Sequence, residues 1–374
     1  MYFQILIILA IIGIIGECYF ISLWIAARRR FVKKFKKYTP PACVIIPCKG
    51  LEEGIESNLN EFCSQHYPTY KVVFVVDSKK DSVYKVLTRI KDNYSNVSVE
   101  ITKPQKNCSG KIAALITGIK STSSTEVIVF ADCDIKPENK WLQNLIEPLQ
   151  DEKIGASTGY RWYFPSDFKT QLISTWNMTS IAFLFHPKYN FTWGGSTAIK
   201  NTIFGELDIK NKWKNAYSDD LVITNAIRNS EYYIYFQPKC IMESIPETSL
   251  KKFNKWGSRQ YTWLRWYYPK IWLPSFIGLF GVKSLTILGI LLIILGFYIP
   301  GVLMVLIVIF EMIFGWQGIA TLQNLMVYPK KRFTSKIYYP LTAPIVFFMI
   351  VQNMIISLFK KEIMWAGRSY KKFK

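Results

Sequence analysis

Short apolar runs alternate with longer amphipathic segments between about residues 42 and 236. The runs are continuous, rich in β-branched and aromatic residues, and cover residues 42–46, 71–76, 97–101 and 127–130. Continuous apolar strands separated by helix-length segments are typical of a parallel sheet covered by helices on both faces. The pattern therefore predicts an α/β domain in which ligands bind at the carboxyl ends of the strands.

Longer apolar stretches flank this domain. Residues 3–27 are long enough to cross a bilayer and no small-residue cleavage site follows them, so we predict a retained anchor. Residues 276–299 and 301–317, separated by Pro300-Gly301, predict a transmembrane hairpin, and residues 339–359 form a further apolar segment. One crossing per segment would put the basic tail on the non-cytosolic side, against the positive-inside rule, so we expect 339–359 to be re-entrant or interfacial.

Basic residues gather beside the apolar segments. A net charge of +21 would suit a nucleic-acid protein, but Arg28-Arg29-Arg30 and Lys330-Lys331-Arg332 lie next to membrane segments, so attraction to anionic lipid headgroups is the simpler explanation. The cluster after residue 27 predicts a cytosolic main domain. Residues 251–275 interleave Trp and Tyr with Lys and Arg, which suits a helix in the headgroup layer. The seven cysteines show no paired spacing, so we expect neither a disulfide framework nor a zinc site.

These segments predict an order of parts along the chain. It comprises a transmembrane anchor at 1–27, a basic juxtamembrane segment at 28–41, a catalytic domain at 42–250, amphipathic interface helices at 251–275, a transmembrane hairpin at 276–318, a cytosolic loop at 319–338, a membrane-embedded segment at 339–359 and a basic cytosolic tail at 360–374.

The candidate chemistry centres on Asp132-Cys133-Asp134. This motif follows the apolar run 126–131 and is expected at the exposed end of a buried strand. Mg²⁺ and Mn²⁺ bind one or two carboxylates together with phosphate oxygens and water, so the pair suits a cation that screens a nucleotide diphosphate. Asp77 and Asp219-Asp220 occupy other boundaries of the same region. The residues alone leave two reactions open, transfer from a nucleotide diphosphate donor and hydrolysis by paired acids.

A series of motifs resembles the inverting family 2 type glycosyltransferases of the GT-A fold, over about residues 42–270. In order they are Val44-Ile45-Ile46-Pro47-Cys48-Lys49-Gly50, Val76-Asp77, Ser109-Gly110-Lys111-Ile112, Ala131-Asp132-Cys133-Asp134, Gly194-Gly195-Ser196 and Ser218-Asp219-Asp220-Leu221. The resemblance is closest to the ceramide glucosyltransferase branch, in Pro47-Cys48-Lys49-Gly50, Phe185-His186-Pro187-Lys188-Tyr189 and the terminal Trp365-Ala366-Gly367-Arg368-Ser369-Tyr370. It implies a Rossmann-like, mostly parallel sheet and an interfacial C-terminal part.

The resemblance also implies a role for each matching residue. Asp77 corresponds to the aspartate that contacts the nucleoside, Asp132 to the one at the sugar and phosphates, and Asp134 completes the metal motif. Asp220 corresponds to the base that takes a proton from the acceptor hydroxyl as this attacks the anomeric carbon and inverts it. Further candidates are, for catalysis, Asp219 and His186 and, for donor binding, Pro47, Lys49, Gly50, Lys111, Gly195, Arg259, Trp263, Arg265 and Trp266.

One element departs from the family pattern. The (Q/R)-x-x-R-W element is represented by Arg259-Gln260-Tyr261-Thr262-Trp263, in which Thr262 replaces the expected Arg. Arg265 lies one helical turn further on, and residues three apart share a helix face, so either Arg259 or Arg265 supplies the cation for the diphosphate. Structural roles stay open for several candidates, namely a snorkelling Trp266, a packed His186, a solvated Lys111 and a simple turn at Gly195.

Together these features predict a membrane-bound, metal-dependent inverting glycosyltransferase with a cytosolic catalytic domain. The first choice of donor is UDP-glucose and the first choice of acceptor is ceramide or a similar lipid hydroxyl. The expected partners are a nucleotide sugar, a lipid, the bilayer and Mn²⁺ or Mg²⁺, with no nucleic acid. The alternatives are a polyprenyl-phosphate glycosyltransferase, a processive polysaccharide synthase and, outside catalysis, a membrane adaptor with a degenerate transferase domain.

Overall fold

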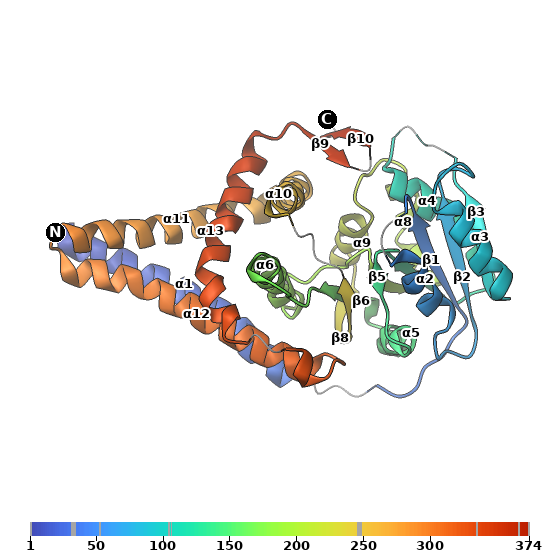
Figure 1. Ribbon diagram of the computed structural model, residues 1–374, viewed down its shortest axis with the longest axis horizontal. Helices are drawn as coiled ribbons and strands as arrows, with labels where there is room; N and C mark the ends of the chain where they lie inside the picture. The colour runs from blue at the N-terminus through green and yellow to red at the C-terminus, as the bar shows by residue number, and fades with distance from the viewer. Residues whose placement is uncertain are drawn as a thin grey trace.

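The computed structural model describes residues 2–30, 35–51, 54–103, 105, 107–244, 249–333, 336–365 and 367–372. Residues 31–34 of the predicted basic segment 28–41 lie outside these ranges. Figure 1 shows an α/β domain from which a stalk of long helices projects. The predicted α/β class with membrane-length helices on both sides of the domain in sequence is confirmed.

An eight-stranded sheet forms the centre of the domain, in the order β3-β2-β1-β4-β7-β6-β8-β5. Its strands are β1 (Ala42–Cys48), β2 (Tyr70–Val76), β3 (Val97–Ile101), β4 (Val127–Ala131), β5 (Ile135–Lys136), β6 (Ile154–Trp162), β7 (Ser196–Lys200) and β8 (Tyr233–Ser244). Strands β3, β2, β1 and β4 are parallel, whereas β7 runs antiparallel to both β4 and β6. The carboxyl ends of β1, β2 and β4 therefore meet at one edge.

Helices cover both faces of the sheet, because successive side chains of a strand point to opposite faces. Val44 and Ile46 of β1 join a core with α2, α3, α5 and α6, whereas Ile45 joins a second core with α4, α7, α8 and α9. Burying each of these side chains contributes roughly 1.5–3 kcal/mol. The helices are α2 (Ile55–Cys63), α3 (Tyr84–Asn93), α4 (Gly110–Gly118), α5 (Trp141–Ile146), α6 (Phe168–Leu184), α7 (Asn201–Glu206), α8 (Ile209–Trp213) and α9 (Asp219–Arg228), with short 3₁₀ turns at Ile119–Thr122, Glu147–Gln150 and Lys330–Arg332.

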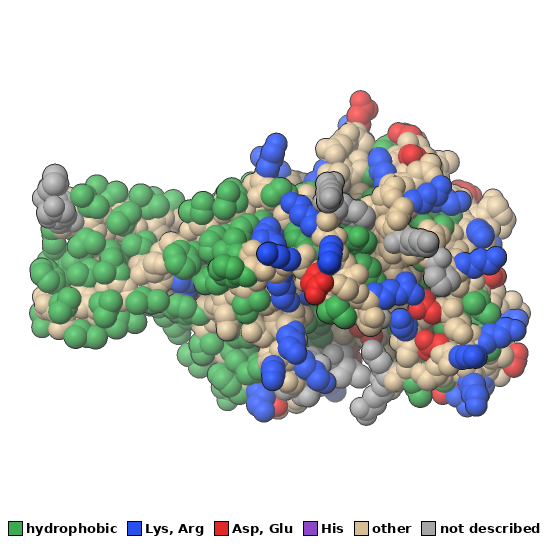
Figure 2. Space-filling view, turned by 90° about the horizontal axis from the view of Figure 1, so that it is seen from above, with side chains coloured by type: hydrophobic (Ala, Val, Ile, Leu, Met, Phe, Trp, Pro, Cys, Tyr) green, Lys and Arg blue, Asp and Glu red, His purple; other side chains and the backbone are tan. Residues whose placement is uncertain are grey.

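Four helices are long and apolar enough to cross a membrane. They are α1 (Tyr2–Arg30), α11 (Pro269–Ile294), α12 (Tyr298–Leu325) and α13 (Tyr338–Phe359). Within the stalk, α12 packs against both α1 and α11. Hydrophobic side chains cover the stalk surface in Figure 2, whereas Lys and Arg gather over the domain and the stalk base. A continuous apolar surface of this kind is stable in contact with lipid.

The turn of the predicted hairpin lies earlier than Pro300-Gly301. α11 ends at Ile294, and Gly296 has a φ of 86°, a conformation that favours glycine. Pro300 instead falls in the first turn of α12, which continues to Leu325 beyond the predicted end of the hairpin. Proline is tolerated there because the first N–H groups of a helix have no acceptor within the helix.

Helix α13 takes a different course from the other three long helices. Figure 1 shows it crossing the base of the stalk, between the stalk and the domain. There it packs against α12, α6 and α10 (Leu250–Tyr267). α13 is as long and apolar as a membrane-spanning helix requires, so its course across the stalk base is what distinguishes it from the other three, and its interfacial or re-entrant placement stays a prediction.

Charged side chains lie inside the stalk. Lys283 of α11 and Glu311 of α12 form an ion pair with side-chain exposures of 3% and 0%, and Glu17 of α1 lies buried beside them. The Lys283 ammonium also lies 4.6 Å from the ring centre of Phe348 in α13. An unpaired charge is costly in lipid, so these contacts favour a packing in which the charged side chains face each other inside the stalk.

Candidate active site

The carboxyl ends of three parallel strands bring predicted residues to one edge of the sheet. Lys49 follows β1, Asp77 follows β2 and Asp132 follows β4, and the register pairs Cys48 with Val76. Lys49 Nζ lies 3.2 Å from Asp77 Oδ2. Each crossover helix returns the chain to the amino end of the sheet, so successive parallel strands end at the same edge and residues distant in sequence meet there.

Lys111 joins this edge to a second acidic cluster. It lies in the first turn of α4, and its ammonium is 2.7 Å from Asp132 Oδ1 and 3.3 Å from Asp219 Oδ2. Burial alone would lower the pKa of the Lys111 ammonium, but the three carboxylates of Asp132, Asp219 and Asp220 outweigh it and raise the pKa above its ordinary value. Lys111 is therefore a permanent cation between the two clusters.

Asp219 and Asp220 begin α9 but occupy different environments. Asp219 is 4% exposed, and burial, opposed by Lys111, raises the pKa of its carboxyl to about 6. Asp220 is half-buried, and its Oδ1 accepts hydrogen bonds from the Ser218 hydroxyl and, at 2.8 Å, from the Leu221 N–H. These bonds fix the Asp220 carboxylate, whereas among the described residues Oδ2 has only the long contact with the Gly194 N–H, at 3.4 Å. Asp220 is thus the better placed of the two for proton transfer.

Gly194 and Gly195 allow the two acidic clusters to approach each other just before β7. A Cβ atom at Gly194 would lie 2.3 Å from Asp219 Oδ2. The Gly194 N–H donates to Asp220 Oδ2 at 3.4 Å, and the Gly195 carbonyl accepts from the Asp132 N–H at 3.4 Å. The sequence singled out Gly195, but the closest approach of charged groups is at its neighbour Gly194.

Asp132 and Asp134 flank Cys133 immediately beyond β4. The Asp132 side chain is 26% exposed and Asp134 is exposed. Within the described ranges, no group of three or more His, Cys, Asp and Glu side chains is arranged to hold a metal ion. Two carboxylates nevertheless suffice for Mg²⁺ or Mn²⁺ when phosphate oxygens and water complete the coordination sphere. The pair therefore fits the predicted metal, with a diphosphate as the remaining ligand.

Helix α10 forms a wall beside the turn that carries the second acidic cluster. The Tyr267 hydroxyl accepts hydrogen bonds from the N–H groups of Tyr217, at 2.9 Å, and Ser218, at 3.2 Å. The buried Trp263 packs on Tyr217 with ring centres 6.0 Å apart, and Trp266 packs edge-on against Trp263 at 5.3 Å. Both predicted tryptophans therefore belong to the cluster that supports this turn.

Two other positions lie on the same side of α10 as Ser258, whose hydroxyl accepts a hydrogen bond from Asn353 of α13 at 3.4 Å. Thr262 is fully buried and its hydroxyl donates to the Ser258 carbonyl at 2.7 Å. The Arg265 guanidinium donates to the carbonyls of Leu358 and, at 2.6 Å, Lys360, where the chain leaves α13. The position that departs from the family pattern is thus a packing position, and Arg265 holds the end of α13.

Arg161 of β6 is a candidate site residue that no sequence motif indicated. Its guanidinium lies over the rings of Trp193, at 5.2 Å, and Trp256, at 4.8 Å. Burial would lower the pKa of Arg161, but neighbouring tyrosines and the aspartates of the Asp-Cys-Asp motif raise it. Burial, with repulsion from Arg161, lowers the pKa of Arg259 to about 10. Arg259 is therefore near enough to Arg161 for the two charges to repel, and its guanidinium lies 5.9 Å from the ring centre of Trp365, whereas Arg265 bonds the end of α13.

Pro47 and Gly50 shape the end of β1. Pro47 lies within the strand, opposite Val75 of β2. Gly50 has a φ of 73°, and its N–H donates to Asp81 Oδ1 at 2.9 Å. This bond fixes the loop that carries Lys49 against the turn before α3.

His186 lies in the loop that follows α6. Its Nδ1 accepts from the Lys188 N–H at 3.1 Å, and its ring packs on Tyr189 at 4.6 Å. The adjacent Phe185 packs on Trp24 of α1 with ring centres 5.8 Å apart. These contacts tie this part of the loop to the stalk.

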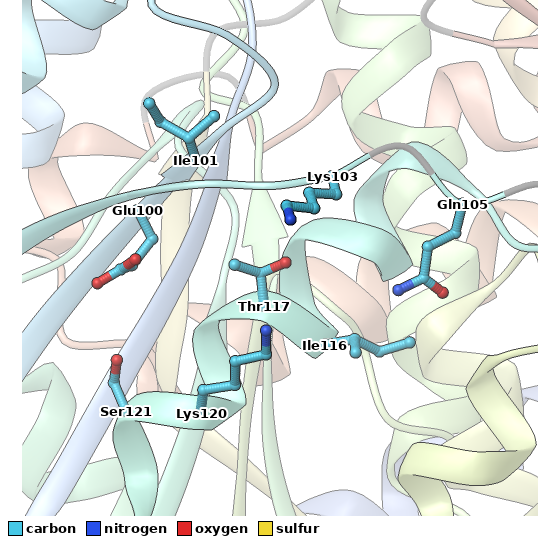
Figure 3. Close-up of a pocket in the computed structure, with 8 residues that line it drawn as sticks. All are labelled: Glu100, Ile101, Lys103, Gln105, Ile116, Thr117, Lys120 and Ser121. Carbon is cyan, nitrogen blue, oxygen red and sulfur yellow. The ribbon is translucent and has the colours of Figure 1, made fainter.

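A small cavity of about 340 Å³ lies along the edge strand β3 and α4. Figure 3 shows Lys103, Thr117 and Lys120 around it, together with Glu100 and Gln105. None of the aspartates discussed above lines this cavity. It is therefore separate from the candidate active site.

Comparisons with known proteins agree with this geometry. The family model described as glycosyl transferase family 21 matches residues 5–372. No curated protein sequence matches the chain significantly. Among solved structures, the chain is similar to the mannosyltransferase PcManGT from Pyrobaculum calidifontis in complex with GDP-Man and Mn²⁺, with a TM-score of 0.55 and 17% identity, over 91% of this chain and 98% of that one. At this identity the likeness demonstrates a shared glycosyltransferase fold.

Proposed function

The chain belongs to glycosyl transferase family 21, and from this premise we propose that it transfers a sugar from a nucleotide-sugar donor to a lipid hydroxyl, with inversion at the anomeric carbon. The observation that carries the proposal is the bridge made by Lys111, whose ammonium lies within 3.3 Å of both Asp132 and Asp219. It joins the strand ends, where a donor nucleotide binds in such folds, to the acidic turn that holds a candidate base.

The donor would lie along the carboxyl edge of the sheet. Asp77, with Lys49 beside it, would contact the nucleoside, and Asp132 and Lys111 would lie at the sugar and phosphates. Arg161 and Arg259 would add positive charge on the opposite side of the diphosphate. The solved neighbour in complex with GDP-Man and Mn²⁺ supports a nucleoside diphosphate sugar as the donor class, and UDP-glucose is our first choice.

Asp132 and Asp134 would hold a divalent cation together with donor phosphate oxygens. When bound, Mn²⁺ or Mg²⁺ would supply positive charge that stabilises the departing diphosphate. Lys111 would keep Asp132 oriented in the absence of the donor, because a strong charge-assisted contact at 2.7 Å fixes one of its oxygens.

Asp220 would act as the general base. Two hydrogen bonds hold its Oδ1, so Oδ2 is the oxygen available to a substrate hydroxyl. As the acceptor oxygen bonds to the anomeric carbon, its proton would move to Asp220 and the bond between that carbon and the diphosphate would break. A single displacement on the face opposite the leaving group inverts the anomeric centre.

A lipid acceptor follows from the continuity between the site and the membrane-length helices. Tyr267 and Tyr268 end α10, and their hydroxyls bond the backbone of the acidic turn at Tyr217, Ser218 and Leu221. Pro269 begins α11 directly afterwards. A headgroup that reaches Asp220 would therefore keep its tail at the membrane surface, with ceramide or a similar lipid as our first choice. Basic segments next to the apolar helices support a cytosolic orientation of the domain.

The proposal is tested by incubating the purified full-length protein with UDP-glucose, GDP-mannose and other nucleotide sugars, extracted lipids and Mn²⁺ or Mg²⁺. We expect a lipid carrying a single added sugar, identified by mass, and an inverted anomeric configuration by NMR. The Asp220→Asn variant is the matched negative control. A product with many sugar units would identify a polysaccharide synthase, and transfer only to a polyprenyl phosphate would identify that class of acceptor. Failure to bind any nucleotide sugar would favour the adaptor.

A further inference from the structure

The C-terminal residues form a small β-hairpin that lies against the candidate donor site. Its strands are β9 (Glu362–Trp365) and β10 (Arg368–Lys371), which pair antiparallel with each other and not with the main sheet. Figure 1 shows the hairpin above the gap between α10 and α4, near the C-terminus. An isolated two-stranded hairpin is marginally stable in water, so its contacts with the rest of the chain must hold it in place.

Aromatic packing fixes the hairpin on α10 and the acidic turn. Ile363 and Tyr370 face each other across the two strands and are 2% and 6% exposed. They join a cluster with Trp263 of α10, and the Tyr370 ring lies 5.0 Å from that of Tyr217. Residues that support the acidic turn therefore also hold the hairpin.

The hairpin carries Arg368 to the nucleoside end of the site. One of its terminal nitrogens lies 3.4 Å from Asp77 Oδ2, the carboxylate that also pairs with Lys49. Its guanidinium lies directly over Gly110 at the start of α4, where a Cβ atom would come within 2.8 Å of it. The Tyr370 hydroxyl lies 3.5 Å from the Gly110 N–H. Arg368 thus reaches the strand-end carboxylate and the helix that carries Lys111 together.

Arg368 has unused capacity for an anion. In the part of the chain that the structure describes, the Arg368 guanidinium makes one long side-chain pair, with Asp77, and its side chain is 33% exposed, whereas a guanidinium has five N–H donors in a planar fork. That fork matches two phosphate oxygens better than a lysine ammonium does. A donor placed between Asp77 and Lys111 would bring its diphosphate beside these free donors.

We propose that Arg368 is a donor-binding residue and that the C-terminal hairpin is the strap that closes the donor site over the diphosphate of the nucleotide sugar. The inference rests on the proposed function and deepens it, since it adds to the site a residue that follows the last membrane-length helix. In the free protein Arg368 rests on Asp77, and the donor diphosphate takes the remaining N–H groups of its guanidinium.

Arg265 is the positioning residue for this strap. It bonds the carbonyls of Leu358 and Lys360, the points at which the chain leaves α13 for β9. The position of the hairpin therefore depends on α10 at two points, through Arg265 where the hairpin begins and through the contacts of Ile363 and Tyr370 with the aromatic cluster around Trp263. Arg265 acts on the donor through the backbone of the hairpin.

The test is a titration of the full-length protein in detergent micelles with UDP and GDP in the presence of Mn²⁺, and with uridine and guanosine. For the nucleoside diphosphate that the native chain binds, Arg368→Gln should raise Kd about tenfold or more, since it removes a charge-assisted bidentate contact. Arg368→Lys should raise it by a smaller factor, and the affinity for the free nucleoside should stay within about twofold. The exposed Lys371 on the same strand provides the control, because Lys371→Gln should leave all affinities unchanged.

The role of Arg265 is tested by a double-mutant cycle. Arg265→Gln should weaken diphosphate binding in the same direction, and Arg265→Gln with Arg368→Gln should be no weaker than Arg368→Gln alone, because both changes act on one contact. Additive losses would overturn the positioning role.

Unchanged diphosphate affinity in Arg368→Gln, in protein with a native Tm, would overturn the donor-binding role of Arg368. Tighter diphosphate binding by this variant would also overturn it, because it would show that the hairpin occludes the site. A native chain that binds neither UDP nor GDP would refute the proposed function itself.

Discussion

Lys111 Nζ lies 2.7 Å from Asp132 Oδ1, which links the N-terminal turn of α4 to the end of the central strand β4. The same ammonium lies 3.3 Å from Oδ2 of the buried Asp219, and the Lys111 side chain is only 15% exposed. Removing it would leave two carboxylates facing each other with little solvent to screen them. We therefore expect both the stability of the fold and, under the proposed function, sugar transfer to depend on Lys111.

Lys111→Met should destabilise the protein by about 3 kcal/mol, because a buried charge that loses its partner is costly. Thermal unfolding in detergent measures this change. Adding Asp219→Asn should restore part of the loss, since the double variant no longer buries an unpaired carboxylate. Lys85→Met, at an exposed position of α3, is the control and should be near neutral. Equal stabilities of the Lys111 and Lys85 variants would contradict the bridging role.

Asp220→Asn should lower the rate of sugar transfer by about 10²–10⁴-fold, the usual contribution of a general base. Donor affinity should change little, because the hydrogen bonds that orient Asp220 come from Ser218 and Leu221 and not from the donor edge. Single-turnover transfer and donor titration separate the two effects. Near-native transfer by this variant would show that another group accepts the proton.

From the raised pKa of Asp219 we expect both the stability of the protein and kcat/KM to depend on pH. Its pKa of about 6 exceeds the ordinary value of 3.8 because the carboxyl is buried. The folded protein therefore binds more protons than the unfolded chain between about pH 4 and 6, so this group lowers stability as pH rises through that window and the loss is complete above it. If the ionised form positions Lys111, kcat/KM should fall as pH drops below about 6, and Asp219→Asn should remove that acidic limb. An unchanged limb in the variant would assign it to another group.

The parallel half of the fold could be predicted from sequence because its strands are buried on both faces and so read as continuous apolar runs. The course of α13 could not be predicted in this way. Its length and apolar composition are those of a membrane-spanning helix. Only its packing against α6, α10 and α12 shows that it crosses the base of the stalk. The turn between α11 and α12 lies before Pro300-Gly301, where the sequence predicts it, because proline occurs both at helix breaks and in the first turn of a helix.

The candidate site residues also divide into those that a sequence motif marks and those that only tertiary contacts bring to the site. Asp77, Lys111, Asp132 and Asp220 lie in short motifs at strand ends or helix starts, where a single sequence retains the signal. Arg161 lies inside a strand among aromatic residues, where no local pattern marks it, and its nearness to the Asp-Cys-Asp motif arises only from the tertiary arrangement. Arg368 lies in the terminal motif that resembles the family, but its approach to Asp77 joins elements distant in sequence, and the motif alone does not predict that contact.

Gly194→Ala should reduce kcat/KM by about 100-fold. The added Cβ would lie 2.3 Å from Asp219 Oδ2 and 2.7 Å from Lys111 Nζ, so the charged groups must move apart, and displacements of about 1 Å have effects of this size. Gly205→Ala is a matched control, since a Cβ there meets no atom within 4 Å and the residue lies in α7. That control should keep full activity and gain up to about 1 kcal/mol of stability. Equal activity of the two variants would mean that the site tolerates separation of Lys111 from Asp219.

Thr262→Arg would recreate the family pattern, yet it should not improve donor binding. Thr262 is fully buried and bonded to Ser258 on the face that packs against α13, so an arginine there would bury an unpaired charge and destabilise the protein by several kcal/mol. Thr262→Ser keeps the hydroxyl and controls for the loss of packing alone.

Arg259→Gln, by contrast, should weaken donor binding about tenfold with a native Tm, because Arg259 is the α10 cation beside Arg161. Tighter donor binding by Thr262→Arg at unchanged Tm would show that this helix presents position 262, and not 259, to the diphosphate.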